Sequence, residues 1–262
     1  MKKYSNNYFY IYIIISFIFL FISYLIYINY ERFSNQNNPN ENIIFINKED
    51  LQNIIRNDKD KYIENLTIYD LRARNVKSSE DYKNIAINSC LDFTDVQKEK
   101  LIRCANIAKN FYDNKLNWVF ACIDNNYEEG MPHTRMDIIF LSPNVINYND
   151  ELLTKTLIHE SVHIFQRYNT EQMLIYLEKN NFKISRHKSQ APFSRANPDL
   201  NEYIYKDKDD NELIANYTNE FPKSLNDINL KNIAFEHPYE KMAYEIGESY
   251  EKYSLSRFID IK

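Results

Sequence analysis

The longest uninterrupted run of apolar positions lies near the start of the chain. Residues 8–30 (YFYIYIIISFIFLFISYLIYINY) contain no charged side chain, and a helix of roughly 20 apolar residues crosses the hydrocarbon core of a bilayer. Tyrosines gather at both ends of the run, as they do at the two headgroup levels of a membrane. Because Glu31 and Arg32 follow where a signal peptide would have a small-residue cleavage site, we expect an uncleaved anchor in the lipid bilayer.

The charges that flank this run set its expected orientation. Lys2 and Lys3 precede it, whereas the two charges that follow it nearly cancel. The positive-inside bias then favours a cytoplasmic N-terminus and places the rest of the chain on the exoplasmic or lumenal side. We expect residues 1–32 to form the anchor with a short cytoplasmic tail, and the polar, Asn-rich residues 33–46 to form a linker.

Residues 47–262 are expected to form one domain, in which a part that contains the predicted strands comes before a mostly helical part. Helical spacing predicts a short helix over residues 47–57 and a longer one from the cap Thr94 to about Asp113. Alternating or β-branched runs predict strands over residues 66–73, 116–123 and 136–141.

Gly130 and Pro132 mark a turn between the last two predicted strands, which should therefore form a hairpin. Residues 150–167 repeat apolar positions at helical spacing behind Asp150, a suitable N-cap. Beyond residue 167 the pattern is mostly helical with long loops. This order predicts an α+β fold, with a small mixed or antiparallel sheet packed on the 150–167 helix and a mainly helical C-terminal part.

Composition narrows the class of function. The net charge is −5, with both signs interspersed and no basic stripe, so nothing indicates a nucleic-acid partner. Glycine occurs only twice, at Gly130 and Gly247, and each is expected where no side chain fits. Cys90, Cys104 and Cys122 are odd in number and lack zinc-knuckle spacing, so one disulfide is the most they can form and its pairing stays open.

The chemistry of the chain is concentrated in the helix predicted over residues 150–167. It contains the string HESVH, in which His159 and His163 lie four positions apart and so project from one face of the helix. Both imidazoles can reach a single zinc ion, and Glu160, one residue further round, can reach the water bound to it. Zinc lowers the pKa of such a water to roughly 7, and a carboxylate beside it accepts the proton.

This motif resembles that of the zincin metallopeptidases, position for position, at His159, Glu160 and His163. The metzincin branch is excluded, because Gln166 and Asn169 stand where its glycine and third histidine would be. The resemblance implies a zinc-dependent metalloendopeptidase that acts on a peptide or protein substrate, with Glu160 as the general base.

The gluzincin branch takes its third zinc ligand from a glutamate on a later helix. Downstream, Pro238 suits the first turn of a helix on which Glu240, Ala243 and Gly247 share one face. Small residues on that face let two helices approach closely. The sequence EKMA from Glu240 resembles the gluzincin Glu-x-x-Ala element, which implies Glu240 as the third ligand.

Alternatives to Glu240 remain in the same stretch. Glu245, Glu248 and His237 are the other candidate ligands. The acid that the family usually has four residues after the ligand, behind a zinc-bound imidazole, is replaced here by Tyr244.

Further residues are candidates for binding substrate. The resemblance implies that residues 134–141, with His133 nearby, form the sheet edge along which an extended peptide pairs. Arg195 and Asn197, in the segment 194–199, can line the cleft or bind a substrate carboxylate. The oxyanion of the tetrahedral intermediate needs a donor opposite the general base, and the candidates are Tyr217, His187, Arg195 and His237.

A different class of function competes with hydrolysis. The chain can also be a membrane-anchored structural or attachment protein in which a metal only supports the fold. Structural zinc sites close the fourth coordination position with Cys or His, so a carboxylate placed as a general base at Glu160 argues for catalysis.

Overall fold

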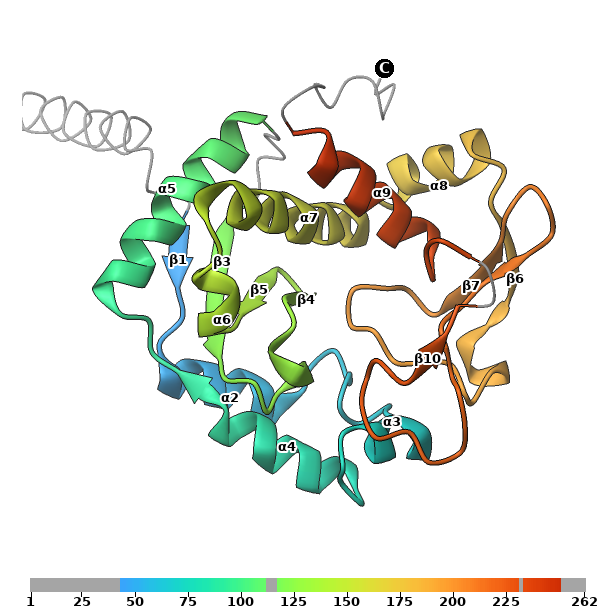
Figure 1. Ribbon diagram of the computed structural model, residues 1–262, viewed down its shortest axis with the longest axis horizontal. Helices are drawn as coiled ribbons and strands as arrows, with labels where there is room; N and C mark the ends of the chain where they lie inside the picture. The colour runs from blue at the N-terminus through green and yellow to red at the C-terminus, as the bar shows by residue number, and fades with distance from the viewer. Residues whose placement is uncertain (1–42, 112–116, 231–232, 251–262) are drawn as a thin grey trace, which may run out of the picture. The chain divides into compact units, whose positions relative to one another are not determined.

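The computed structural model describes residues 43–111, 117–230 and 233–250 (Figure 1). No helix within these ranges is long and apolar enough to cross a bilayer. The anchor predicted over residues 8–30 lies outside the described residues. Strand β1 (Ile43–Phe45) falls within the segment predicted to be a linker, so the folded part begins before residue 47.

A five-stranded mixed sheet lies at the centre of the described residues. Strands β1, β3 and β5 run parallel to one another in that order. Strand β4 pairs antiparallel with β5 and ends the sheet on that side, while β2 pairs antiparallel with β3. Their bounds are β2 Cys90–Leu91, β3 Trp118–Ile123, β4 His133–Arg135 and β5 Ile138–Leu141.

Helices cover both faces of this sheet. Alternate positions of β3 point to opposite faces, so that Phe120 packs in one hydrophobic cluster and Ala121 in another. The first cluster joins the sheet to α5, α7 and α9, and the second joins it to α2 and α4 (Figure 1). The helices are α2 Lys48–Asn57, α3 Ile68–Ala73, α4 Ser79–Asn88, α5 Asp95–Phe111, α6 Pro143–Ile146, α7 Asp150–Tyr168, α8 Thr170–Lys179 and α9 Pro238–Glu248.

The C-terminal part differs from the prediction. Between α8 and α9 the described chain forms short strands joined by loops, rather than helices. Strands β6, β7 and β8 form an antiparallel sheet, and β9 pairs with β10. Of the buried apolar residues there, Tyr205 packs with α7 and α9, Ile204 and Ile214 form a small cluster of their own, and Tyr217 packs with Ala73 of α3. The spacing of apolar residues alone does not distinguish such packing from a helix. The strands are β6 Lys183–His187, β7 Tyr203–Lys206, β8 Glu212–Leu213, β9 Asn216–Tyr217 and β10 Ile228–Asn229.

Residues 66–73, predicted to be a strand, contain helix α3. Thr67 is its N-cap: the hydroxyl accepts the Asp70 N–H, and the Asp70 carboxylate accepts the Thr67 N–H. This capping box satisfies free donors of the first turn and fixes a helix start. The alternation of apolar residues was therefore a misleading signal, and the cap decides the structure.

The predicted hairpin between residues 116–123 and 136–141 is also wrong, because β3 and β5 are parallel. Strand β4 carries the chain back between them and forms the true hairpin with β5. The turn of that hairpin contains Met136 at a φ of 54°. In α7 the N-cap is Asn149, whose side chain accepts the Leu152 N–H, and not Asp150.

Candidate metal centre

Helices α7 and α9 pack directly against each other (Figure 1) and carry the residues of the predicted site. Gly247 faces α7, where a methyl group in place of its hydrogen would lie 3.4 Å from the Lys155 carbonyl oxygen and 3.7 Å from His159 Cβ. Ala243, one turn before it, is fully buried. These small residues bring α9 close enough for Glu240 to reach across to α7.

The three predicted ligands converge on one point. His159 Nε2 and His163 Nε2 are 3.0 Å apart. Glu240 Oε2 lies 3.5 Å from His159 Nε2 and 3.8 Å from His163 Nε2. Among the described residues, no other group of three or more His, Cys, Asp or Glu is arranged to hold a metal ion.

These separations fit a tetrahedral zinc ion. Bonds of about 2.0–2.2 Å from zinc to nitrogen or oxygen place neighbouring ligand atoms roughly 3.3–3.5 Å apart. Two imidazoles and one carboxylate also leave the fourth position free, which distinguishes a catalytic site from a structural one. The donor set and its spacing therefore suit zinc with one open position.

The charge states of the ligands are those that a cation requires. Burial lowers the pKa of His163, more than the nearby Asp199 and Glu240 raise it, so its ring is neutral near pH 7. Burial alone would raise the pKa of Glu240, but His163, His159 and Asn197 lower it to about 2. A neutral imidazole and an ionised carboxylate both have a lone pair free for a metal.

Gln166 fixes the orientation of His163. Its side-chain oxygen lies 2.9 Å from His163 Nδ1, so an Nδ1–H donates to it and the Nε2 lone pair faces the other ligands. Its amide donates in turn to the Tyr239 carbonyl oxygen on α9, at 3.0 Å. Tyr244, which replaces the usual acid, instead sets its ring edge-on to His159 at 4.8 Å between centroids. The signal for Gln166 was its place three residues after His163 on a buried face.

Glu160 is 2 % exposed, and its Oε2 has no hydrogen-bond partner among the described residues. Burial raises the pKa of this carboxyl well above its usual value, and the charges of Asp199 and Glu240 raise it further. The side chain lines the same cavity as His159 and Glu240. Glu160 therefore brings a buried carboxyl with an unpartnered oxygen to the cavity that His159 and Glu240 line.

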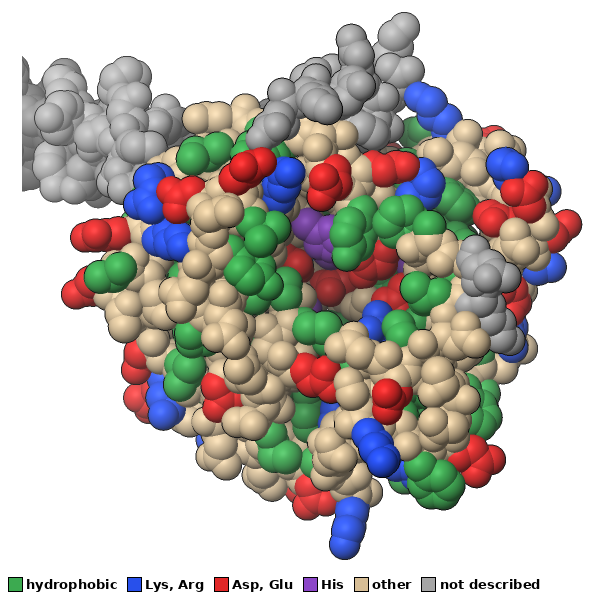
Figure 2. Space-filling view, viewed as in Figure 1, with side chains coloured by type: hydrophobic (Ala, Val, Ile, Leu, Met, Phe, Trp, Pro, Cys, Tyr) green, Lys and Arg blue, Asp and Glu red, His purple; other side chains and the backbone are tan. Residues whose placement is uncertain are grey.

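A cavity of about 470 Å³ opens over these residues. Figure 2 shows it as a hollow with histidine and acidic side chains inside. Of the four buried side-chain atoms without a partner among the described residues, three belong to residues that line it: His133 Nε2, Glu160 Oε2 and Arg195 Nε. Unsatisfied buried polar atoms are rare, so their gathering here indicates a site built for a polar ligand.

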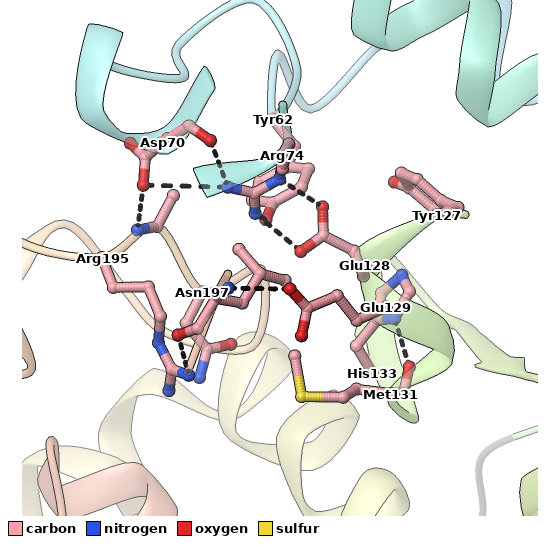
Figure 3. Close-up of polar contacts among 12 residues, drawn as sticks. Tyr62, Asp70, Arg74, Tyr127, Glu128, Glu129, Met131, His133, Arg195 and Asn197 are labelled. Atoms are coloured by element: carbon pink, nitrogen blue, oxygen red, sulfur yellow. Dashed lines mark hydrogen bonds and ion pairs between the residues drawn. The ribbon is translucent and has the colours of Figure 1, made fainter. Parts of the chain in front are cut away.

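One wall of the cavity is a strained turn. Glu128, Glu129 and Gly130 have φ values of 48°, 54° and 69°, and a side chain on Gly130 would overlap Asn125. This confirms the expectation for Gly130. Arg74 holds Glu128 in place with an ion pair at 2.6 Å (Figure 3). The turn leads directly into His133, at the start of β4.

The remaining candidates separate into two groups. Arg195 and Asn197 line the cavity, as predicted. Tyr217 does not, because its hydroxyl donates to Asp70 at 2.9 Å. His237 is the N-cap of α9, where Nδ1 accepts the Tyr239 N–H, and His187 is an exposed residue outside the cavity. The structure therefore does not bring Tyr217, His237 or His187 to the position of an oxyanion donor.

Of the edge predicted over residues 134–141, only β4 lies at the edge of the sheet, because β5 is paired with β3 on one side and with β4 on the other. The outer side of β4 is itself closed. The Thr134 N–H points away from β5 and donates to Asp199 Oδ1 at 2.6 Å. Arg167 of α7 donates to the Thr134 hydroxyl at 3.2 Å and to its carbonyl oxygen at 3.5 Å. An extended peptide has no free backbone group of Thr134 with which to pair.

Comparison with protein-family models, with curated proteins and with solved structures gives no match to this chain.

Proposed function

We propose that the protein is a zinc-dependent peptidase that hydrolyses peptide bonds in the cavity between α7, α9 and β4. The observation that carries this proposal is the convergence of His159, His163 and Glu240 on one point with a fourth position free. A buried carboxylate with an unpartnered oxygen, Glu160, stands beside that point. Metal-assisted hydrolysis needs both parts.

Each residue then has a defined task. When bound, zinc supplies the positive charge that acidifies water and polarises the scissile carbonyl. Glu160 Oε2 accepts the proton of the attacking water and passes it to the leaving amine. The raised pKa of Glu160 favours the first transfer, because a carboxylate that holds a proton more tightly is the stronger base. The closed edge of β4 favours substrates that enter the cavity without adding a strand to the sheet.

The charge-free residues 8–30 support a further part of the proposal. They serve as the membrane anchor, with the N-terminus cytoplasmic and the catalytic domain exoplasmic or lumenal.

The substitution Glu160→Gln tests the proposal in the full chain, purified in detergent. It removes the proton acceptor and keeps the size and the metal ligands. We expect zinc content to be unchanged and cleavage of a quenched-fluorescent peptide library to fall by about 10²–10⁴-fold. Glu151→Gln, on the exposed side of the same helix, is the matched control, and His163→Ala should lose zinc and activity together.

A chain that binds zinc but cleaves peptides equally with and without the Glu160 carboxylate would contradict this mechanism. Zinc binding with no cleavage of any library peptide would favour the alternative, a membrane-anchored structural or attachment protein with a non-catalytic metal site.

A further inference from the structure

The two oxygens of the Glu240 carboxylate have different partners. Oε2 faces the imidazoles of His159 and His163. Oε1 instead accepts a hydrogen bond of 2.9 Å from Asn197 Nδ2. Only one oxygen of Glu240 is therefore directed at the metal position.

The same amide nitrogen of Asn197 also donates to Glu236 Oε1, at 2.9 Å. Its two hydrogens thus serve two carboxylates that belong to the same stretch of chain, Glu236 just before α9 and Glu240 in its first turn. Both carboxylates lie in the wall of the cavity, and Glu236 is 9 % exposed. A neutral donor between two acids satisfies both of them and separates their charges.

Asn197 is itself held in place. Its side-chain oxygen accepts the Asp199 N–H at 3.0 Å, which fixes the direction of the amide. Arg195 pairs with Glu236 at 2.5 Å and donates to the Leu225 carbonyl oxygen at 3.3 Å. Figure 3 shows Arg195 and Asn197 on one side of the view, across from Glu128 and His133.

The backbone around Asn197 is anchored on both sides. The Ala196 N–H donates to Asp70 Oδ1 at 2.8 Å, and Arg167 donates to the Pro198 carbonyl oxygen at 3.1 Å. Asp70 follows the N-cap of α3, and Arg167 lies in α7. The backbone on both sides of the amide is therefore tied to α3 and α7.

We propose that Asn197 is a positioning residue that holds Glu240 as a one-oxygen ligand, an inference that rests on the proposed metal centre. With Oε1 bound to the Asn197 amide, the carboxylate cannot turn to present both oxygens to the metal. The fourth position then stays free for the reacting groups. The sequence made Asn197 a candidate for substrate binding, but in the structure its side-chain amide donates to Glu240.

The test is metal affinity, because partners that orient a ligand typically change it by about 10–100-fold when removed. Asn197→Leu keeps the size of the side chain and removes its donors. In the full chain we expect zinc affinity, measured by competition with a chromogenic chelator, to fall by about 10–100-fold. In the cobalt-substituted protein the visible absorption should weaken, as Glu240 binds through both oxygens and the coordination number rises above four.

Asn201→Leu is the matched control, since Asn201 bonds the Tyr205 hydroxyl and His237 but not Glu240. It should keep wild-type zinc affinity and cobalt spectrum. If Asn197→Leu does not fold, Asn197→Ala removes the same donors without the bulk and gives the same comparison.

Zinc affinity within threefold of wild type for the Asn197 variant, with an unchanged cobalt spectrum, would overturn the proposal. An equal loss in the Asn201 variant would also overturn it, because the effect would then be general loosening. Every measurement here reports metal binding, so the role of Asn197 is tested separately from the peptidase activity that Glu160→Gln tests.

Discussion

Gly247 offers a sharp test of how closely α7 and α9 must approach. Sequence reasoning expects no side chain to fit there, yet a methyl group would meet Lys155 O at 3.4 Å and His159 Cβ at 3.7 Å, which are ordinary contact distances. The backbone of Gly247 is helical, so alanine brings no conformational strain. We therefore expect Gly247→Ala to keep or slightly raise the stability of the fold and Gly247→Leu to lower it.

The magnitudes follow from the two effects. Alanine in place of glycine stabilises a helix interior by roughly 0.5–1 kcal/mol, less near a helix end, so we expect a gain of at most about 1 kcal/mol. That corresponds to a rise in melting temperature of about 2–4 °C for a protein of this size. A methyl group already lies 3.4 Å from the Lys155 carbonyl oxygen, so the further carbons of leucine should overpack this contact and cost about 1–3 kcal/mol.

The leucine variant should also lose zinc. Gly247 lies seven positions after Glu240 on the same helix, or about 10 Å along the axis. Displacement of α9 therefore moves the carboxylate away from the two imidazoles. Thermal unfolding followed by circular dichroism, with and without zinc, measures both effects. A Gly247→Ala variant destabilised by more than about 1 kcal/mol, or unable to bind zinc, would show that the reasoning about this contact is wrong.

Two further results are expected. Burial, with the nearby Lys188, lowers the pKa of His237 to about 3, so only the unfolded state binds this proton between about pH 6.5 and 3. The unfolding free energy should then decrease as the pH is lowered through that window, by up to about 1.4 kcal/mol per pH unit. The variant His237→Asn keeps an N-cap side chain, and its unfolding free energy, measured by urea titration at several pH values, should depend less steeply on pH. Burial also raises the pKa values of Cys90, Cys104 and Cys122. A thiol reagent should therefore label these cysteines only in the urea-unfolded protein. An intact-protein mass lower by the two hydrogens that one disulfide removes would contradict this expectation.

The elements that depend on neighbouring residues were predictable. The four-residue spacing of His159 and His163 places them on one face wherever the helix forms. The cap Thr94, which accepts the Gln97 N–H, marks the start of α5 as expected. The place of Glu240 near the two histidines could be found because the residues that share its helix face, Ala243 and Gly247, are small enough to let α9 approach α7.

Other features depend on residues far apart in sequence. The direction of β3 relative to β5 is set by the inserted β4, which no local pattern reveals. The task of Asn197 depends on a hydrogen bond to Glu240, 43 positions away. The capping box of Thr67 and Asp70 is different, because it joins residues only three positions apart, whereas the alternation of apolar residues predicted a strand there.

The bonds of Asp199 and Arg167 to Thr134 also bear on how the molecule behaves among its own copies. An open end strand is a template on which two sheets can join, and proteins that leave one bare are prone to associate and aggregate. Here the Asp199 carboxylate accepts the outward-facing N–H of Thr134 in β4, and the Arg167 guanidinium donates to the carbonyl oxygen of the same residue. The charged pair that denies an incoming peptide its backbone partner therefore also protects this end of the sheet from self-association at high concentration.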